Sequence, residues 1–244
     1  MLQKTNGIVL RSIKYGDSSI ISTIFTSLYG VQTYIIQGVR STKARQNKAG
    51  FFQPGILLEL VTYHHPQKKM QHIREYQPAY IYSSLQESVV KNSVVLFSVE
   101  LLLRLLPEHA PMVTLFDFVY EYFITLDNTT PDRVANFPLY FIVQCGGTLG
   151  YELKGSYSKE TPYLNIEDGG FTGHPSLTTS YVNEEDTKML NTLLFAKNMD
   201  DLKQVEMNAD ARMRLIDWYI SFLKLHTQHM GNIKSLAVLR AILH

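Results

Sequence analysis

Four cations occupy nine consecutive residues in the first quarter of the chain, namely Arg40, Lys43, Arg45 and Lys48. No acidic residue interrupts this segment. Solvent-facing cations in such a group bind phosphates well, because a polyanion that is neutralised at several points releases its condensed counterions. The segment therefore predicts a nucleic-acid contact, and we favour this function over the alternative of a solvated surface loop.

Two smaller basic groups accompany this segment. Arg11 and Lys14 lie beside Tyr15, and a second group of lysines and histidines surrounds the strand-breaking Pro66. In a small barrel of the expected type, the loops after the first strand and before the fifth border one groove. We therefore expect the three groups to share a surface. The predicted nucleic-acid-binding residues are Arg11, Lys14, Tyr15, Arg40, Lys43, Arg45, Lys48, Lys68, Lys69 and Arg74.

Aromatic rings are the second requirement of a protein that binds single strands, because unpaired bases stack on them. The candidates in this region are Tyr15, Tyr34, Phe51, Phe52 and Tyr63. Three of them, Tyr34, Phe51 and Phe52, are more typical of core or edge packing than of stacking platforms.

Signatures of catalysis are missing from the sequence. It has no GxxxxGK[ST] loop, no GxSxG elbow and no HExxH zinc motif. The single cysteine, Cys145, excludes an internal disulfide and a multi-cysteine zinc site, and its apolar neighbours predict a buried thiol. His64 and His65 have no acidic or cysteine partner at metal-binding spacing. We therefore expect no enzyme activity, no metal and no cofactor.

The charges are unevenly distributed, although the whole chain has a net charge of +1. Residues 1–80 contain ten Lys and Arg against three acids, a net charge of +7, and residues 81–244 carry −6. A basic part joined to an acidic part indicates a polyanionic partner for the basic part. No apolar run approaches the roughly 20 residues of a membrane span, and the N-terminal residues lack the apolar core of a secretory signal. A cytoplasmic protein without membrane contact is the expectation.

Five short strands are predicted in the basic part from β-branched content, alternation and turn signals. Such a set in about 75 residues suggests a small closed barrel, which leaves no exposed edge. A long polar link, 38–53, joins the third strand to the fourth. The predicted strands are 6–13, 19–28, 31–37, 56–63 and 70–76.

Helical spacing of apolar residues begins at residue 83 and predicts a helical domain. Asn136 and Asn232 are expected to cap two of its helices, and the Gly146-Gly147 pair indicates close packing. The glycine- and proline-rich segment 151–182 is expected to be an irregular insertion with short strands near 163–166 and 171. The predicted helices are 83–106, 112–126, 137–149, 184–196, 211–226 and one after Asn232.

Four stretches together resemble the bacterial RecO family of DNA repair and recombination mediator proteins. They are TNGIVLRSIKYGDSSIISTIFTSLYG at 5–30, GVRSTKARQNKAGFFQPGILLEL at 38–60, TLGYEL at 148–153 and IKSLAVL at 233–239. The resemblance runs through nearly the whole chain in the right order. It implies an α+β multidomain protein, with a five-stranded OB-fold β-barrel followed by an α-helical domain.

The expected domains are an OB-fold at 1–80, a helical domain at 81–150 and 183–244, and the insertion at 151–182. Many family members carry a four-cysteine zinc site in this insertion, but the present segment has no cysteine, so zinc is not carried over. The resemblance implies binding and annealing of single- and double-stranded DNA at the nucleoid. It also implies interaction with RecR and with the acidic C-terminal tail of single-stranded-DNA-binding protein. Through these partners the protein would help load RecA.

Two other functions remain open from the residues themselves. The barrel is equally suited to an RNA-binding OB module, because recognition of a 2′-hydroxyl leaves no trace in a sequence. It is also suited to an interaction scaffold whose basic surface binds an acidic protein tail. Salt-dependent binding of an oligonucleotide distinguishes the scaffold from the nucleic-acid binders.

Overall fold

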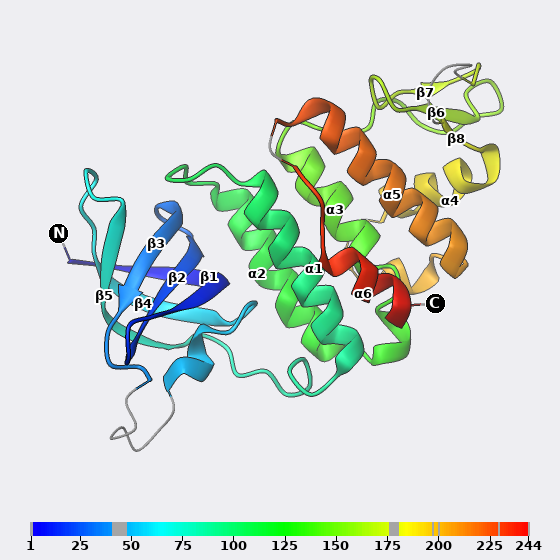
Figure 1. Cartoon of the computed structure of the whole chain (residues 1–244). Coiled ribbons are helices and arrows are strands. Elements are labelled where there is room, and N and C mark those ends of the chain that lie inside the picture. Colours follow the sequence, from blue (N-terminus) through cyan, green and yellow to red (C-terminus); the bar gives the residue numbers. More distant parts are fainter. Residues whose placement is uncertain are drawn as a thin grey trace. The chain divides into compact units, whose positions relative to one another are not determined.

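The computed structural model describes residues 2–40, 48–175, 181–196, 198–199, 201–228 and 230–243, and Figure 1 traces the chain. The barrel strands are β1 (Leu2–Tyr15), β2 (Ser19–Thr26), β3 (Gly30–Ile36), β4 (Leu57–Tyr63) and β5 (Met70–Pro78). The α-helices are α1 (Val89–Leu105), α2 (Val113–Asn128), α3 (Phe137–Thr148), α4 (Glu184–Leu194), α5 (Ala209–His226) and α6 (Ser235–Ile242). Shorter elements are η1 (Lys48–Phe52), η2 (Pro131–Arg133), η3 (Asp201–Gln204), β6 (Tyr163–Asn165), β7 (Phe171–Thr172) and β8 (Tyr181–Val182).

The first five strands form a closed barrel in the order β1-β2-β3-β5-β4. The β3–β5 pairing is parallel, and the other four pairings are antiparallel. This five-stranded Greek-key barrel is the OB-fold, and with the helices that follow it confirms the predicted fold class. All five predicted strands are present, and β1 extends beyond the predicted range 6–13 at both ends.

The barrel interior is filled by alternate residues of its strands and is sealed by η1. β1 bends at an irregularity between Val9 and Arg11, which lets one strand pair with β4 along its first half and β2 along its second. The buried core comprises Val9, Ile20, Ile24, Tyr34, Ile36, Val39, Phe52, Ile56, Leu58 and Leu60.

Part of the outer surface of the barrel is covered by α2. Ile8 and Phe25 are opposite each other on β1 and β2 and alternate with core residues, yet both are fully buried. The ring of Phe25 packs edge-on against Phe116 of α2, at a centroid distance of 5.3 Å. The backbone N–H of His109, in the segment before α2, donates to the carbonyl of Val31 on β3. The barrel therefore has one wall covered by α2, whereas outward residues near the end of β1, such as Ile13 and Tyr15, remain exposed.

The contacts divide the chain into two compact units. The barrel unit comprises 1–86 and 106–128, and the helical unit comprises 87–105 and 129–244. Helix α2 thus groups with the barrel, whereas the sequence assigns it to the helical domain; the domain boundaries at 80, 150 and 183 stay a prediction. In the part of the chain that the structure describes, no helix has the length and apolar character needed to cross a membrane.

In the helical unit, α1 packs on α3 and α6, and α3 packs on α5. The predicted apolar stripe of α5 is buried. The Cys145 thiol is also buried, and this burial raises its pKa. A Cβ atom on Gly146 would lie 2.4 Å from the hydroxyl of Tyr219, so the close packing predicted for the Gly146-Gly147 pair is confirmed at Gly146, whereas a Cβ on Gly147 would make only an ordinary contact at 3.9 Å.

The start of the first helix differs from the prediction. The first predicted helix begins at residue 83, but α1 begins at Val89. The backbone N–H groups of Ser83, Ser84 and Leu85 instead donate to the carboxylate of Asp127. A tertiary acceptor therefore competes with the helix for these donors.

Both predicted asparagine caps lack the expected hydrogen bond. Asn136 is at the N-cap of α3, but its side chain donates to the carbonyl of Val205 and accepts from Arg212. The N-cap residue of α6 is Lys234 rather than Asn232, and a carboxylate from α1, that of Glu100, accepts the N–H of Lys234 at 2.9 Å. Both differences arise because long-range polar partners replace local caps.

The cysteine-free insertion contains a three-stranded sheet, β7-β6-β8, and is joined to α4 and α5 by packing and hydrogen bonds. The N–H of Tyr157 donates to Asn191 Oδ1 at 3.0 Å, and Tyr219 Oη donates to the carbonyl of Tyr151 at 2.8 Å. Gly169 lies against the ring of Phe222, where a Cβ would approach to 2.9 Å. These contacts occupy the region where the family resemblance implies zinc in other members.

Candidate nucleic-acid interface

The second half of β1 presents a basic and aromatic face to solvent. Arg11, Ile13 and Tyr15 alternate along the strand, so their side chains share the outer face. Ile13 is 46% exposed and Tyr15 is 52% exposed. Such exposed fractions are high for large apolar side chains on a strand. They show that α2 does not cover this part of the outer wall of the barrel.

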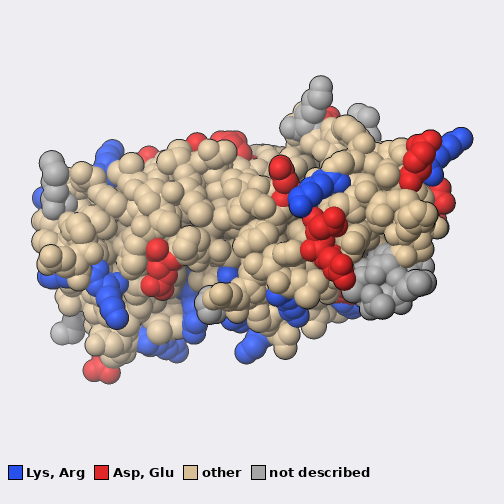
Figure 2. All heavy atoms as spheres, turned by 90° about the horizontal axis from the view of Figure 1, so that it is seen from above, with Lys and Arg blue, Asp and Glu red and all other residues tan. Residues whose placement is uncertain are grey.

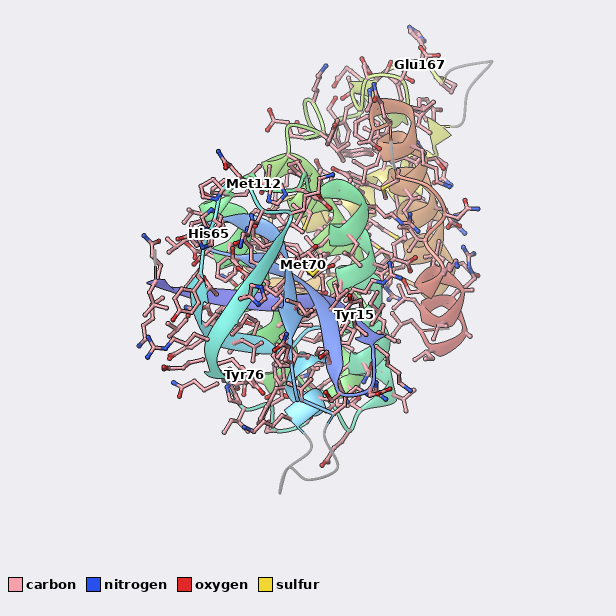
Figure 3. The ribbon with its side chains drawn as sticks, turned by 60° about the vertical axis from the view of Figure 1, so that its left-hand side comes forward. Tyr15, His65, Met70, Tyr76, Met112 and Glu167 are labelled. Atoms are coloured by element: carbon pink, nitrogen blue, oxygen red, sulfur yellow. The ribbon has the colours of Figure 1, made fainter. Side chains whose placement is uncertain are left out.

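This face continues across three neighbouring strands through the strand register. Ile13 is opposite Ile21, Ile21 is opposite Ile35, and Ile35 is beside His72 on β5. A row of apolar side chains therefore crosses the wall from β1 to β3 and ends at a histidine. We call this surface the open wall, and Figure 3 labels two of its residues, Tyr15 and Met70. It comprises Arg11, Ile13, Tyr15, Ile21, Thr23, Thr33, Ile35, Met70, His72 and Arg74.

The sequence predicted Arg11, Tyr15 and Arg74 of the open wall but not its isoleucine row. Alternating isoleucines in a strand indicate one buried face, and nothing in the pattern shows that the second face is also apolar and accessible. The sequence does not show which part of the barrel α2 covers, so it does not show which outward apolar residues stay exposed.

Arg40 lies beside the β1–β2 turn, which forms one end of the open wall. Its backbone N–H donates to the carbonyl of Ser18 at 3.0 Å, and its guanidinium lies 3.4 Å from the carbonyl of Gly16. Gly16 has a φ of 59°, a left-handed conformation that the tight turn requires. The exposed Lys14 precedes this turn. The structure thus brings together the first cation of the 40–48 link and the basic group of β1.

Of the remaining three cations of the link, the structure describes one. Lys43 and Arg45 lie outside the described residues. Lys48 is exposed and begins η1. They stay predicted contacts.

The predicted group around Pro66 is divided by the fold. Arg74 belongs to the open wall, but Lys68 and Lys69 are in the β4–β5 turn. Tyr63, just before that turn, is opposite Leu2, so the turn is near the end of β1 that lies farthest from Tyr15. The two lysines are therefore at the opposite rim of the barrel from Arg40.

The β4–β5 turn is itself well ordered by side chains. The Gln71 amide accepts the N–H of His65 and donates to the carbonyls of His65 and Lys68. His64 stacks on Tyr29 with ring centroids 3.8 Å apart, and burial lowers its pKa. Both lysines project from a fixed turn, and their exposed ammonium groups remain available to an anion.

The aromatic candidates separate into buried and exposed rings. Tyr34 and Phe52 are fully buried in the barrel core, and Phe51 packs partly against it. Tyr15 and Tyr63 are about half exposed. The open wall therefore offers one exposed aromatic ring, that of Tyr15, beside its isoleucine row.

The cations on the open wall and beside it have few acidic partners. Among the described residues, Arg11, Lys14 and Arg40 pair with no carboxylate, and Arg74 has an exposed pair with Glu75 at 3.2 Å. Figure 2 shows blue atoms gathered along one side of the barrel part, with isolated red groups among them. Cations without an acidic partner can attract an external anion with no competition from a neighbouring carboxylate.

The described residues contain no cluster of three or more His, Cys, Asp or Glu able to hold a metal. The arrangement can instead hold phosphates with its cations and pack against bases or sugars with its apolar row.

Comparison with known proteins points to one family. Residues 1–82 match the family model described as Recombination protein O N terminal, and residues 86–159 match Recombination protein O C terminal. The chain is 30% identical over 243 residues to the DNA repair protein RecO of Bacteroides fragilis, covering 99% of both chains. It is 29% identical over 242 residues to the DNA repair protein RecO of Christiangramia forsetii, again covering 99% of both. The chain belongs to the RecO family of DNA repair proteins.

Proposed function

We propose that the open wall binds single- and double-stranded DNA during recombinational repair, without catalytic chemistry. One observation carries the proposal: Arg11, Lys14 and Arg40, which have no acidic partner among the described residues, flank an apolar row on the wall that α2 leaves uncovered. Family membership supplies the repair context.

The proposed mechanism is electrostatic and independent of sequence. Arg11, Arg40 and Arg74 contact phosphates, while Tyr15 offers its ring to a base. Lys14 adds a phosphate contact beside Arg40. Further contacts come from Lys43, Arg45 and Lys48 along the link, and Lys68 and Lys69 hold a strand that reaches the far rim. Strand annealing and RecA loading, with RecR and the acidic tail of single-stranded-DNA-binding protein as partners, complete the proposal.

Salt dependence separates this function from an interaction scaffold. We expect the triple variant Arg11→Ala, Arg40→Ala and Arg74→Ala to bind a labelled single strand at least tenfold more weakly at low salt. The slope of log affinity against log salt should fall by about 2, because each neutralised phosphate of a single strand contributes roughly 0.7. The measurement is a fluorescence anisotropy titration at several salt concentrations.

The matched control removes three exposed cations from the helical unit, Lys154, Lys159 and Lys188. Equal losses in both triple variants would overturn the assignment to the open wall. No salt-dependent binding of any oligonucleotide would favour the scaffold. An RNA strand of the same sequence, titrated in parallel, tests the RNA-binding alternative.

A further inference from the structure

A second feature of the barrel unit is a cavity of about 470 Å³ at the end of the barrel that η1 seals. Its size falls in the usual range for sites that bind small molecules or single groups of a larger ligand. It lies between η1 and the segment that follows β5. The principal lining residues are Phe51, Gln53, Tyr80, Ile81, Tyr82 and Gln86.

The walls of this cavity are held in place by hydrogen bonds. Tyr82 Oη donates to the carbonyl of Gly55 at 2.7 Å, and the rings of Tyr80 and Tyr82 pack edge-on with centroids 5.4 Å apart. The next residues, Ser83 and Ser84, donate their backbone N–H groups to Asp127. A ligand would therefore meet a preformed site and would lose little affinity to ordering it.

The lining has the chemistry of a base-binding site rather than of an ion-binding site. It contains aromatic rings and Ile81 but no Asp, Glu, Lys, Arg or His. The exposed amides of Gln53 and Gln86 each carry donors and acceptors, which match the edges of a nucleobase. Aromatic faces stack on any base, so such a site tolerates all four.

Charge next to the cavity indicates how a base would reach it. Lys48 is exposed and opens η1, two residues before Gly50 in the lining. A strand whose phosphates contact Lys48 thus has its bases within reach of the cavity. A base in a duplex is paired and stacked, so this contact is open to single strands alone.

We infer that the cavity lined by Phe51, Tyr80, Ile81 and Tyr82 takes one unpaired base of a single-stranded nucleic acid. The inference rests on the proposed function, and it adds a physical reason for the protein to distinguish single strands from duplexes. The open wall supplies affinity for any phosphate backbone, and the cavity supplies the preference for unpaired bases.

The test places an acid at the mouth of the cavity. Ile81 is 83% exposed, so Ile81→Glu should fold normally. Val113→Glu is the matched control, because Val113 is 56% exposed in the same unit and receives the same charge. Affinities for a single strand and for a duplex of equal length are measured at one salt concentration.

We expect Ile81→Glu to weaken single-strand binding about tenfold more than duplex binding, the range for loss of one stacked base. Val113→Glu should weaken both equally and slightly. A single strand with abasic positions should bind the wild type and Ile81→Glu alike. A 2-aminopurine base in the strand should lose fluorescence on binding the wild type.

Three results would overturn the inference. Equal losses for single strand and duplex in Ile81→Glu would overturn it while leaving the proposed function intact. Unchanged single-strand affinity together with weaker capture of an acidic peptide tail would assign the cavity to a protein partner instead. Absence of any salt-dependent oligonucleotide binding in the wild type would overturn both proposals.

Discussion

Two arginines of the barrel unit remain available to an external ligand, whereas in the helical unit the arginines of α5 and α6 are engaged in the structure. Arg11 and Arg40 have no acidic partner among the described residues. In the helical unit, Arg214 and Arg240 make ion pairs at 2.7 and 2.8 Å. The buried Arg212 donates to Asn136 and to a backbone carbonyl. The number of basic residues in each unit does not reveal which arginines are free to bind an external anion.

The two units also neutralise a buried carboxylate in different ways. Asp127 in the barrel unit and Asp186 in the helical unit are each 2% exposed. Asp127 accepts three backbone N–H groups, and Asp186 accepts two hydrogen bonds from Arg214. The barrel unit thus stabilises its acid with backbone donors, and leaves its cations for an external anion.

The largest expected effect comes from removing the Asp127 carboxylate. Asp127→Ala orphans the N–H groups of Ser83, Ser84 and Leu85, so we expect a loss of about 3 kcal/mol of unfolding free energy. Hydrogen exchange resolved to peptides should show the loss in the barrel unit. Asp117→Ala removes the same charge from an exposed position of α2 and should cause no comparable change.

The same carboxylate predicts a pH dependence. Burial alone would raise the pKa of Asp127, but the backbone donors lower it from 3.8 to about 2. A group whose pKa is depressed by folding stabilises the fold fully above its unfolded value and loses that contribution as pH falls through the folded value. Barrel protection should therefore decline between pH 4 and pH 2 in the wild type. A parallel decline in Asp127→Ala would contradict this assignment.

A smaller effect is expected from Arg214→Ala in the helical unit. It leaves the buried Asp186 carboxylate without its bidentate partner, and we expect a loss of about 2 kcal/mol. The single tryptophan, Trp218, lies in α5 of the same unit, so its fluorescence reports denaturant unfolding there. Lys188→Ala, an exposed cation on α4, is the control.

Oligonucleotide affinity is the second measurement on Arg214→Ala. It should stay within about twofold of the wild type, because this cation is already engaged. A loss as large as that of the triple variant Arg11→Ala, Arg40→Ala and Arg74→Ala would remove the distinction between the two units.

Local patterns in the sequence predict most of the fold. Alternation and turn residues locate all five barrel strands, because each strand has one face in the core. Helical spacing locates α2 through α5 for the same reason. The errors occur where distant polar groups compete with local ones, as at Asn136, whose amide bonds to Arg212 and Val205.

The interface is less predictable from sequence because it depends on which outward residues remain uncovered. Ile13 and Phe25 are both apolar and both face out of the barrel, but Phe25 is buried near Phe116 and Ile13 is exposed. The position of Lys68 relative to Arg74 likewise depends on strand register, since two residues close in sequence are separated along the barrel.

The smallest expected effect concerns the acid at the edge of the open wall. Arg74 and Glu75 form an exposed pair at 3.2 Å, and such a pair contributes less than about 1 kcal/mol to stability. Glu75→Gln should therefore leave stability nearly unchanged. It should raise oligonucleotide affinity about twofold, because it frees Arg74 and removes the repulsion between the Glu75 carboxylate and a phosphate of the nucleic acid. Glu185→Gln, an exposed acid at the start of α4, is the control and should change neither quantity. A fall in affinity for Glu75→Gln would mean that the pair positions Arg74, and the barrel's cations would then resemble those of the helical unit more closely than their exposure suggests.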